Sequence, residues 1–341
     1  MQKRPFRWPP DKAAVRTRAI RLEWVTIGAL LSSALALFLV SGASQAVRSA
    51  FIEDLISIAP AVAFLVAVRI ERKPPSRRFP FGTFRAVSIA YLVGAVATLL
   101  LGVFLFVENV IALFAAERPV IGNVVVFGTA ISEAWLMLAA ILYSTIPAVI
   151  LGRLKLPLAR AIHDKVLVAD ASMQKADWMT GVAALLGVGG ILIGWWWVDS
   201  GAAIVIAVAI LHDGFTHVGR SIRDLADERP TTIEGHLPDP IVGKVRKAVL
   251  ALEFVDTADV RFREDGRLVT GVIHITAPAG AGLPDDFARI VRDTAEHVDW
   301  RVHDPDVVLI ASVPERPAGK LQTTVQAPRS RRRSATTRSS S

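Results

Sequence analysis

Long apolar runs with few charges alternate with shorter basic segments between Trp24 and Leu211. The run from Ala86 to Val107 contains no Asp, Glu, Lys or Arg. An uncharged run of about 18 residues or more is typical of a transmembrane helix, because about 20 helical residues cross the hydrocarbon core of a bilayer. Four runs long enough to cross a membrane come first in the chain: Trp24–Val40, Ala46–Val68, Ala86–Phe114 and Val120–Leu151.

The following apolar stretch, Trp178–Leu211, is too long for one crossing and short for two, and Asp199 is its one charged residue. Trp favours the membrane interface and Gly interrupts helices, so the segment Gly194–Gly201 predicts a turn at the membrane surface. A fifth span of about 20 residues must then extend back through Asp177 to Met173. The pattern therefore predicts six spans and places Asp177 inside the membrane.

The distribution of Lys and Arg orients these spans. Seven basic residues precede Leu22, six lie between Arg69 and Arg85, and four lie between Arg153 and Lys165. The predicted loops on the other side carry one basic residue at most. The positive-inside rule therefore predicts an integral, multi-pass protein of the plasma (inner) membrane with both termini in the cytoplasm.

Composition narrows the class of protein further. Hydrophobic residues make up 52% of the chain, the mean hydropathy is +0.44 and the formal net charge is +8. These values argue against a soluble enzyme and against a disordered chain. The positive charge lies mainly in predicted cytoplasmic loops, so it indicates anionic lipid and no nucleic-acid partner. The chain has no cysteine, which excludes disulfides and thiolate metal ligands.

The chain changes character at about residue 221 and becomes typical of a soluble α+β domain. Two amphipathic helices and three short strands are expected in the order αββαβ, a ferredoxin-like arrangement with one helical layer on a sheet. The expected elements are Ile241–Leu252, Asp259–Arg263, Leu268–Thr276, Asp285–His297 and Val307–Val313. We thus predict a basic cytoplasmic N-terminal segment (1–22), an all-α six-span domain (23–220), a cytoplasmic α+β domain (221–315) and a disordered basic tail (316–341).

Acidic residues inside the predicted spans are the candidates for function, because each costs about 2.5–3.5 kcal/mol to insert at the centre of a membrane. Glu53 and Ser57 lie four residues apart and share a helix face, as do Met173 and Asp177. Facing one another, they assemble two carboxylates, a hydroxyl and a thioether. Such a set suits a divalent transition metal. Two nearby carboxylates in a medium of low dielectric retain a proton when empty, so metal and protons compete, as an antiporter requires.

Three further acidic residues are candidates for supporting roles around these four residues. Some of the candidates also fit a purely structural role. Asp54 and Asp170 are candidates for contacts behind the metal ligands or for a proton relay, although Asp54 also fits a helix end. Glu133 is a similar candidate in the middle of the fourth predicted span, with pairing between helices as the alternative. Met173 also fits an apolar core position.

Four segments resemble the cation diffusion facilitator (cation efflux) family, and the resemblance extends over about Trp24–Ser312. It implies a homodimer that moves a divalent metal out of the cytoplasm in exchange for protons, with no resident cofactor. It also implies that Glu53, Ser57, Met173 and Asp177 bind the metal. The segments are Ser44–Ser57, the aromatic-Gly loop Phe79–Arg85, Ala169–Asp177 and Val198–Ala202.

The chain departs from the family pattern at several positions. The family usually has Asp, His or Asn where this chain has Ser57 and Met173, and Val87 replaces a usual Glu. His274 matches a metal position of the family's cytoplasmic domain, but the last predicted strand lacks the partner His. His274 is therefore a weak candidate for a metal ligand in the cytoplasmic domain.

The main hypothesis is a metal/proton antiporter with alternating access. The alternative is a membrane-anchored metal-binding or regulatory protein whose transport site has degenerated. No nucleophile–base pair or HExxH motif occurs, so we do not expect an enzyme. The identity of the metal stays open among Zn²⁺, Fe²⁺, Co²⁺, Mn²⁺ and Ni²⁺.

Overall fold

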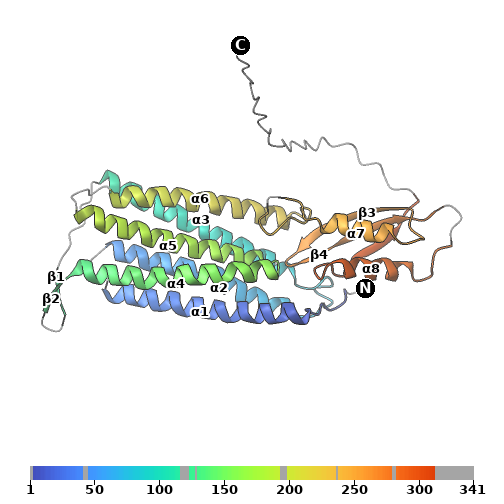
Figure 1. The fold of residues 1–341 in the computed structure, drawn as a ribbon, viewed down its shortest axis with the longest axis horizontal. Helices are drawn as coiled ribbons and strands as arrows, with labels where there is room; N and C mark the ends of the chain where they lie inside the picture. The colour runs from blue at the N-terminus through green and yellow to red at the C-terminus, as the bar shows by residue number, and fades with distance from the viewer. Residues whose placement is uncertain are drawn as a thin grey trace, which may run out of the picture.

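The computed structural model describes residues 3–40, 45–115, 123–126, 129–192, 198–235, 237–278 and 282–311. In this part of the chain, six long helices lie side by side along the molecule, and a small domain of strands and helices adjoins one end of them (Figure 1). The long helices are α1 (Pro10–Val40), α2 (Gln45–Glu71), α3 (Arg85–Phe114), α4 (Glu133–Ala161), α5 (Lys165–Leu192) and α6 (Val198–Leu225).

Five of these helices are long and apolar enough to cross a membrane, as judged over the described residues. The stretches are Pro10–Leu39, Phe51–Glu71, Arg85–Phe114, Leu138–Ala161 and Ser200–Leu225. Large apolar side chains such as Phe38, Leu100 and Val205 are exposed on the outside of the bundle, which fits contact with lipid. The helical part is therefore a membrane-type domain with five candidate spans. A crossing by α5 stays a prediction.

The fourth helix begins later than the sequence pattern predicts. A hairpin of β1 (Asn123–Val126) and β2 (Thr129–Ser132) occupies residues that were expected to be helical. Consecutive β-branched valines at 124–126 favour a strand over a helix there. The predicted span Val120–Leu151 is therefore wrong in its start. Glu133 is the first residue of α4 and does not lie in the middle of a span.

Three other helices extend beyond the limits predicted for the six-span domain or its spans. Helix α1 begins at Pro10, so much of the predicted basic N-terminal segment is helical. Helix α5 begins at Lys165, eight residues before Met173, and α6 continues past residue 221 to Leu225. Charged side chains in these extra turns pair with one another, as described below. The helices are therefore longer than the apolar runs from which hydropathy predicted their ends.

Close backbone contact between α3 and α6 depends on glycine. A Cβ added to Gly214 of α6 would lie 2.7 Å from the Cα of Leu99, and one added to Gly102 of α3 would lie 2.9 Å from the backbone N of Leu211. Real Cβ atoms do not approach so closely, so any larger residue would separate the two helices. Small residues at helix interfaces are a common device for packing in membranes.

A fully buried ionic triad joins α1, α4 and α5. The Lys155 Nζ lies 3.2 Å from Glu23 Oε2 and also forms an ion pair with Asp170. All three side chains have no exposed area. The sequence pattern assigned Lys155 to a cytoplasmic loop, whereas it lies inside α4 with two acidic partners. The two carboxylates allow the burial of the lysine, because a buried charge needs a hydrogen-bonded counter-charge.

The small domain follows α6 and has the element order expected from the sequence. Its elements are α7 (Ile241–Leu250), β3 (Thr257–Asp265), β4 (Leu268–Thr276), α8 (Phe287–Val298) and β5 (Asp306–Leu309). Strands β3 and β4 are antiparallel, and β5 lies parallel to β4 at the edge. Val245 and Val249 of α7 and Val291 of α8 pack with Ile273 and Ile275 of β4, all without exposed area. These residues form the core of a small C-terminal sheet-and-helix region.

The turn between β3 and β4 reaches into the helical domain and anchors the two parts together. Arg267 is buried there, with its Nε 2.5 Å from Asp164 Oδ2 and its Nη1 2.5 Å from Glu71 Oε2. Burial acts to lower the pKa of Arg267, but Asp164 and Glu71 raise it above its ordinary value, so the guanidinium stays charged. Gly266 has φ +69°, and an added Cβ would lie 2.5 Å from the carbonyl oxygen of Phe84.

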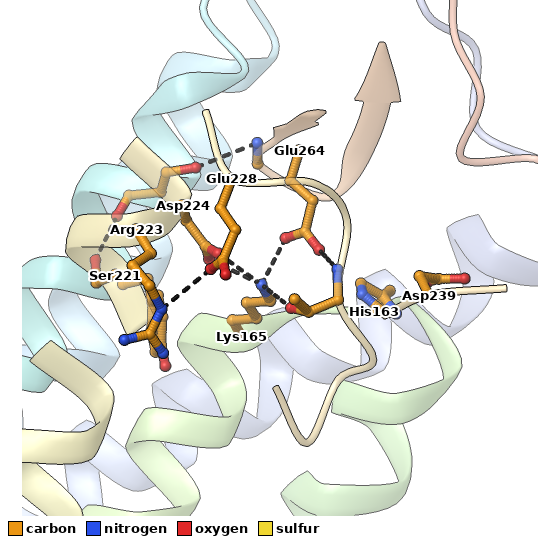
Figure 2. Close-up of polar contacts among 12 residues, drawn as sticks. His163, Lys165, Ser221, Arg223, Asp224, Glu228, Asp239 and Glu264 are labelled. Atoms are coloured by element: carbon orange, nitrogen blue, oxygen red, sulfur yellow. Dashed lines mark hydrogen bonds and ion pairs between the residues drawn. The ribbon is translucent and has the colours of Figure 1, made fainter. Parts of the chain in front are cut away.

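A second ionic cluster lies at the same junction. Figure 2 shows Lys165 of α5 between Asp224 of α6 and Glu264 of β3, with Nζ–oxygen distances of 2.8 and 2.6 Å. Glu264 Oε1 accepts a hydrogen bond from the backbone N of Thr231. The cluster therefore connects the start of α5, the end of α6, the linker after α6 and the small domain.

The N-terminal segment packs against the small domain. Lys3 Nζ donates hydrogen bonds to Thr270 Oγ1 and to the carbonyl oxygen of Asp304, at 2.8 and 2.6 Å. Phe6 and Trp8 both contact the ring of Trp300. This segment therefore adds a third connection between the helices and the sheet.

Replacing Arg267 with Met should strongly destabilise the protein. The substitution leaves Asp164 and Glu71 buried with their main counter-charge removed, and breaking a buried ion pair on one side costs about 3–5 kcal/mol. We expect a clear fall in the apparent Tm of the purified protein in detergent, followed by intrinsic tryptophan fluorescence.

Arg289→Met is the matched control, because Arg289 of α8 is 65% exposed and pairs at the surface. Its Tm should stay near that of the wild-type protein, since exposed ion pairs contribute little. Equal Tm values for the two variants would contradict a stabilising role for the Arg267 anchor.

Candidate metal site between α2 and α5

Two carboxylates from facing helices lie together in the interior of the helical domain. Glu53 and Ser57 are four residues apart on α2, and Gln174 and Asp177 are three residues apart on α5. These spacings place each pair on one face of its helix, and α2 packs against α5. Glu53 and Asp177 are each 8% exposed, whereas Ser57 and Gln174 have no exposed area. The helices thus bring two acids and two neutral polar groups into one buried region.

Asp177 is held by neutral hydrogen-bond donors. Ser57 Oγ donates to Asp177 Oδ1 at 2.7 Å, which joins α2 directly to α5. Gln174 Nε2 donates to the other oxygen, Asp177 Oδ2, at 3.4 Å. Both donors orient the carboxylate without cancelling its charge.

Glu53 faces the same region. Its carboxylate interacts electrostatically with Asp177, and the Thr180 hydroxyl of α5 lies beside it. Its Oε1 is buried and has no hydrogen-bond partner. Glu53 thus keeps a buried carboxylate oxygen without a hydrogen bond, in a region that Asp177 influences electrostatically.

No ion pair joins Glu53 or Asp177 to a basic side chain within the described ranges. The basic residue that influences Asp177 from a distance is Lys155, and Glu23 and Asp170 already hold its ammonium group. A pair of buried acids without a counter-charge requires a proton or a bound cation, because two adjacent ionised carboxylates are very unfavourable in low dielectric. The arrangement is therefore suited to binding a cation.

Asp54 lies next to Glu53 in the chain but interacts with a different helix. It is 4% exposed, its side chain lies beside Ser33 of α1, and its Oδ2 has no hydrogen-bond partner. Asp170 is part of the ionic triad with Lys155. A role for either residue in proton transfer stays a prediction.

Met173 lies one helical turn before Asp177 and is fully buried. It belongs to an apolar cluster with Leu101 and Leu105 of α3 and Ile210 of α6. The structure thus places the thioether among apolar side chains where α5 meets α3 and α6. Its predicted role as a metal ligand remains a prediction.

The remaining candidates lie away from this pair. Glu133 begins α4, and its side chain lies outside those that the structure describes. His274 lies on β4, opposite Asp259 of β3, and its buried Nδ1 has no hydrogen-bond partner. His163 was not among these candidates, and it lies at the junction with the small domain. Burial lowers the pKa of His163 to about 3, so its neutral Nδ1 accepts a hydrogen bond from Arg301 Nη1 at 3.1 Å. His163 therefore has a structural contact at the junction.

The sequence reasoning missed Gln174. Its spacing of three residues from Asp177 was the available signal, since that spacing places an amide on the same helix face as the acid. Among the described residues, no group of three or more His, Cys, Asp or Glu side chains is arranged to hold a metal ion. A site here therefore has two acids as its charged groups and neutral donors for the rest.

Comparisons with known proteins agree with this architecture. Residues 22–226 match the model of the cation efflux transmembrane domain. The chain is 26% identical to the manganese efflux system protein MneS of Bacillus subtilis over 184 residues, which cover 54% of this chain and 59% of MneS. It thus spans less than two thirds of that relative.

Two further relatives are transporters without an assigned substrate. The chain is 26% identical to the uncharacterised transporter YdbO of Bacillus subtilis, over 77% of this chain and 87% of YdbO. It is 22% identical to the uncharacterised transporter MJ0449 of Methanocaldococcus jannaschii, over 73% and 82% of the two chains. Together with the match over residues 22–226 and the helical membrane-type domain, these findings show that the chain belongs to the cation efflux family.

Proposed function

We propose that this protein exports a divalent metal cation from the cytoplasm across the plasma (inner) membrane in exchange for protons. The observation that carries the proposal is the pair of buried carboxylates, Glu53 and Asp177, with no basic partner among the described residues. A divalent cation neutralises both acids at once. Protons neutralise the same oxygens when the metal leaves.

Manganese is the favoured substrate in this proposal. The groups around Asp177 and Glu53 that could bind a metal are carboxylate, hydroxyl and amide oxygens. Oxygen ligands of this kind are typical of Mn²⁺ sites, whereas zinc sites are built mostly from imidazole and thiolate. The name of the relative MneS, a manganese efflux protein, points the same way.

The cation must reach the site from each side in turn, because Glu53 and Asp177 are both almost fully buried. We propose alternating access, in which α3 and α6 move as a closely packed pair against the other helices. The glycine contacts at Gly102 and Gly214 support this part of the proposal, since they hold α3 and α6 together. Cytoplasmic termini, a homodimer and a ferredoxin-like cytoplasmic domain complete the proposed architecture.

Neutralising either acid should abolish transport. Glu53→Gln and Asp177→Asn keep the size and much of the hydrogen bonding of the side chains but remove the charge that offsets a divalent cation. We expect Mn²⁺ uptake into proteoliposomes to fall to the level of empty vesicles for both variants, measured with a metal-sensitive dye inside the vesicles.

Asp54→Asn is the comparison variant, because Asp54 is also a buried carboxylic acid, adjacent in the chain, and lies beside Ser33 of α1. It should retain measurable Mn²⁺ flux. Wild-type rates for Glu53→Gln and Asp177→Asn, in vesicles that contain equal amounts of protein, would exclude this pair as the transport site.

A proton gradient should drive the transport of the metal into vesicles. If protons replace the cation on Glu53 and Asp177, an acidic vesicle interior promotes release of the metal inside and return of the protonated carrier. We expect faster Mn²⁺ uptake into vesicles with an acidic interior than into vesicles of uniform pH. The ionophore nigericin should remove the difference, and uptake that ignores the gradient would show that the transport is not coupled to protons.

A further inference from the structure

Gln174 is an amide buried without full hydrogen bonding. Its side chain has no exposed area, its Nε2 donates to Asp177 Oδ2, and its Oε1 has no hydrogen-bond donor. Buried polar atoms are nearly always paired, because leaving one unpaired in an apolar interior is unfavourable. The unpaired Oε1 of Gln174 therefore calls for an explanation. The location of the amide next to Asp177 indicates a role in the candidate metal site.

The surrounding helices make room for this amide. Gly152 of α4 faces it so closely that an added Cβ would lie 3.2 Å from the Cβ of Gln174. On the opposite side, α2 contributes Ser57, which bonds the other oxygen of Asp177. Gln174 thus lies where α4 and α5 pack, and it reaches the acid that Ser57 reaches from α2.

We propose that Gln174 supplies the α5 oxygen ligand that makes the site prefer hard divalent cations such as Mn²⁺ over Zn²⁺. In the empty site, the amide N–H group orients Asp177. When a cation binds to the Asp177 carboxylate, a rotation about the last side-chain torsion exchanges Nε2 for Oε1 and directs the carbonyl at the metal. That torsion is broad and has two favoured states, so the exchange is inexpensive.

The resulting ligand set contains oxygen alone. Glu53 and Asp177 give carboxylates, Ser57 a hydroxyl and Gln174 an amide carbonyl. Hard cations such as Mn²⁺ prefer oxygen ligands of this kind, whereas Zn²⁺ sites in proteins are built mostly from imidazole and thiolate. The inference rests on the proposed function, and it gives the place of the second α5 ligand to Gln174, where the sequence pattern predicted Met173.

The location of Met173 supports this assignment. Its thioether packs with Leu101 and Ile210 in the apolar cluster. A ligand role for Met173 would require it to leave that cluster. Gln174 already has a hydrogen bond to Asp177 and needs to rotate its terminal amide alone.

The test compares Mn²⁺ and Zn²⁺ binding to the full-length protein in detergent, by competition with a fluorescent chelator. The variants are Gln174→Leu, which removes both amide atoms, and Gln174→Glu, which keeps an oxygen at the same place. We expect Gln174→Leu to weaken Mn²⁺ binding by about tenfold or more and Zn²⁺ binding by much less. We expect Gln174→Glu to keep the preference for Mn²⁺.

Thr98→Val is the matched control, because Thr98 is a buried polar residue of α3 that bonds the backbone of its own helix. It should leave the ratio of the two affinities unchanged. Retained Zn²⁺ binding by Gln174→Leu shows that this variant is folded. If Gln174→Leu does not fold, Gln174→Glu decides the question, since loss of its Mn²⁺ preference would mean that Gln174 acts as an N–H donor alone.

Two results would overturn the inference while the proposed transport function stands. One is an unchanged or equally weakened affinity for both cations in Gln174→Leu. The other is a fall in the Mn²⁺ to Zn²⁺ ratio that occurs in Met173→Leu and not in Gln174→Leu, which would make the thioether the selective donor. Failure of the wild-type protein to move any divalent cation in proteoliposomes would instead remove the proposed function itself.

Discussion

Two acids buried together without a counter-charge set the main constraint on this structure. Glu53 of α2 and Asp177 of α5 interact electrostatically, and the groups that bond Asp177, Ser57 and Gln174, are neutral. Holding two ionised carboxylates in such a place is very unfavourable, so the site is stable when a cation or a proton shares the charge. In the proposed function, the same pair accounts for both the binding of a metal and its competition with protons.

The ionic triad of Glu23, Lys155 and Asp170 shows the opposite solution to the same problem. There the protein supplies its own cation, and the lysine ammonium ties three helices together. The junction repeats this device on a larger scale, with Arg267 held by Asp164 and Glu71. Acids that have a basic partner in the fold are thus structural. Glu53 and Asp177 have no ion-pair partner among the described side chains, and in the proposed function they bind an external cation.

Much of this architecture could be predicted from the sequence, because long apolar runs and the alternation of β-strand residues report directly on burial. The order of the C-terminal elements follows from their hydrophobic patterns. Spacing placed Ser57 on the helix face of Glu53, and the hydrogen bond from Ser57 to Asp177 agrees with the expectation that this face meets the fifth predicted span. Hydropathy gave the wrong location for charged residues that are buried in ion pairs. It assigned Lys155 to a loop, because it cannot show that Glu23 and Asp170 neutralise the lysine inside the bundle. It also failed at residues 123–126 and 129–132, where two apolar β-strands resemble the start of a helix in composition. Gln174 was missed because an uncharged amide gives no signal in a search for intramembrane charges.

The central claim is that the metal displaces protons from Glu53 and Asp177. The most direct measurement counts the protons that the purified protein releases when Mn²⁺ is added in a weakly buffered detergent solution. The account predicts release of about one proton or more per bound metal near neutral pH, because binding requires deprotonated carboxylates. It also predicts that this release disappears when both acids are replaced by their amides. Binding of Mn²⁺ with no proton release between pH 6 and 8 would contradict it.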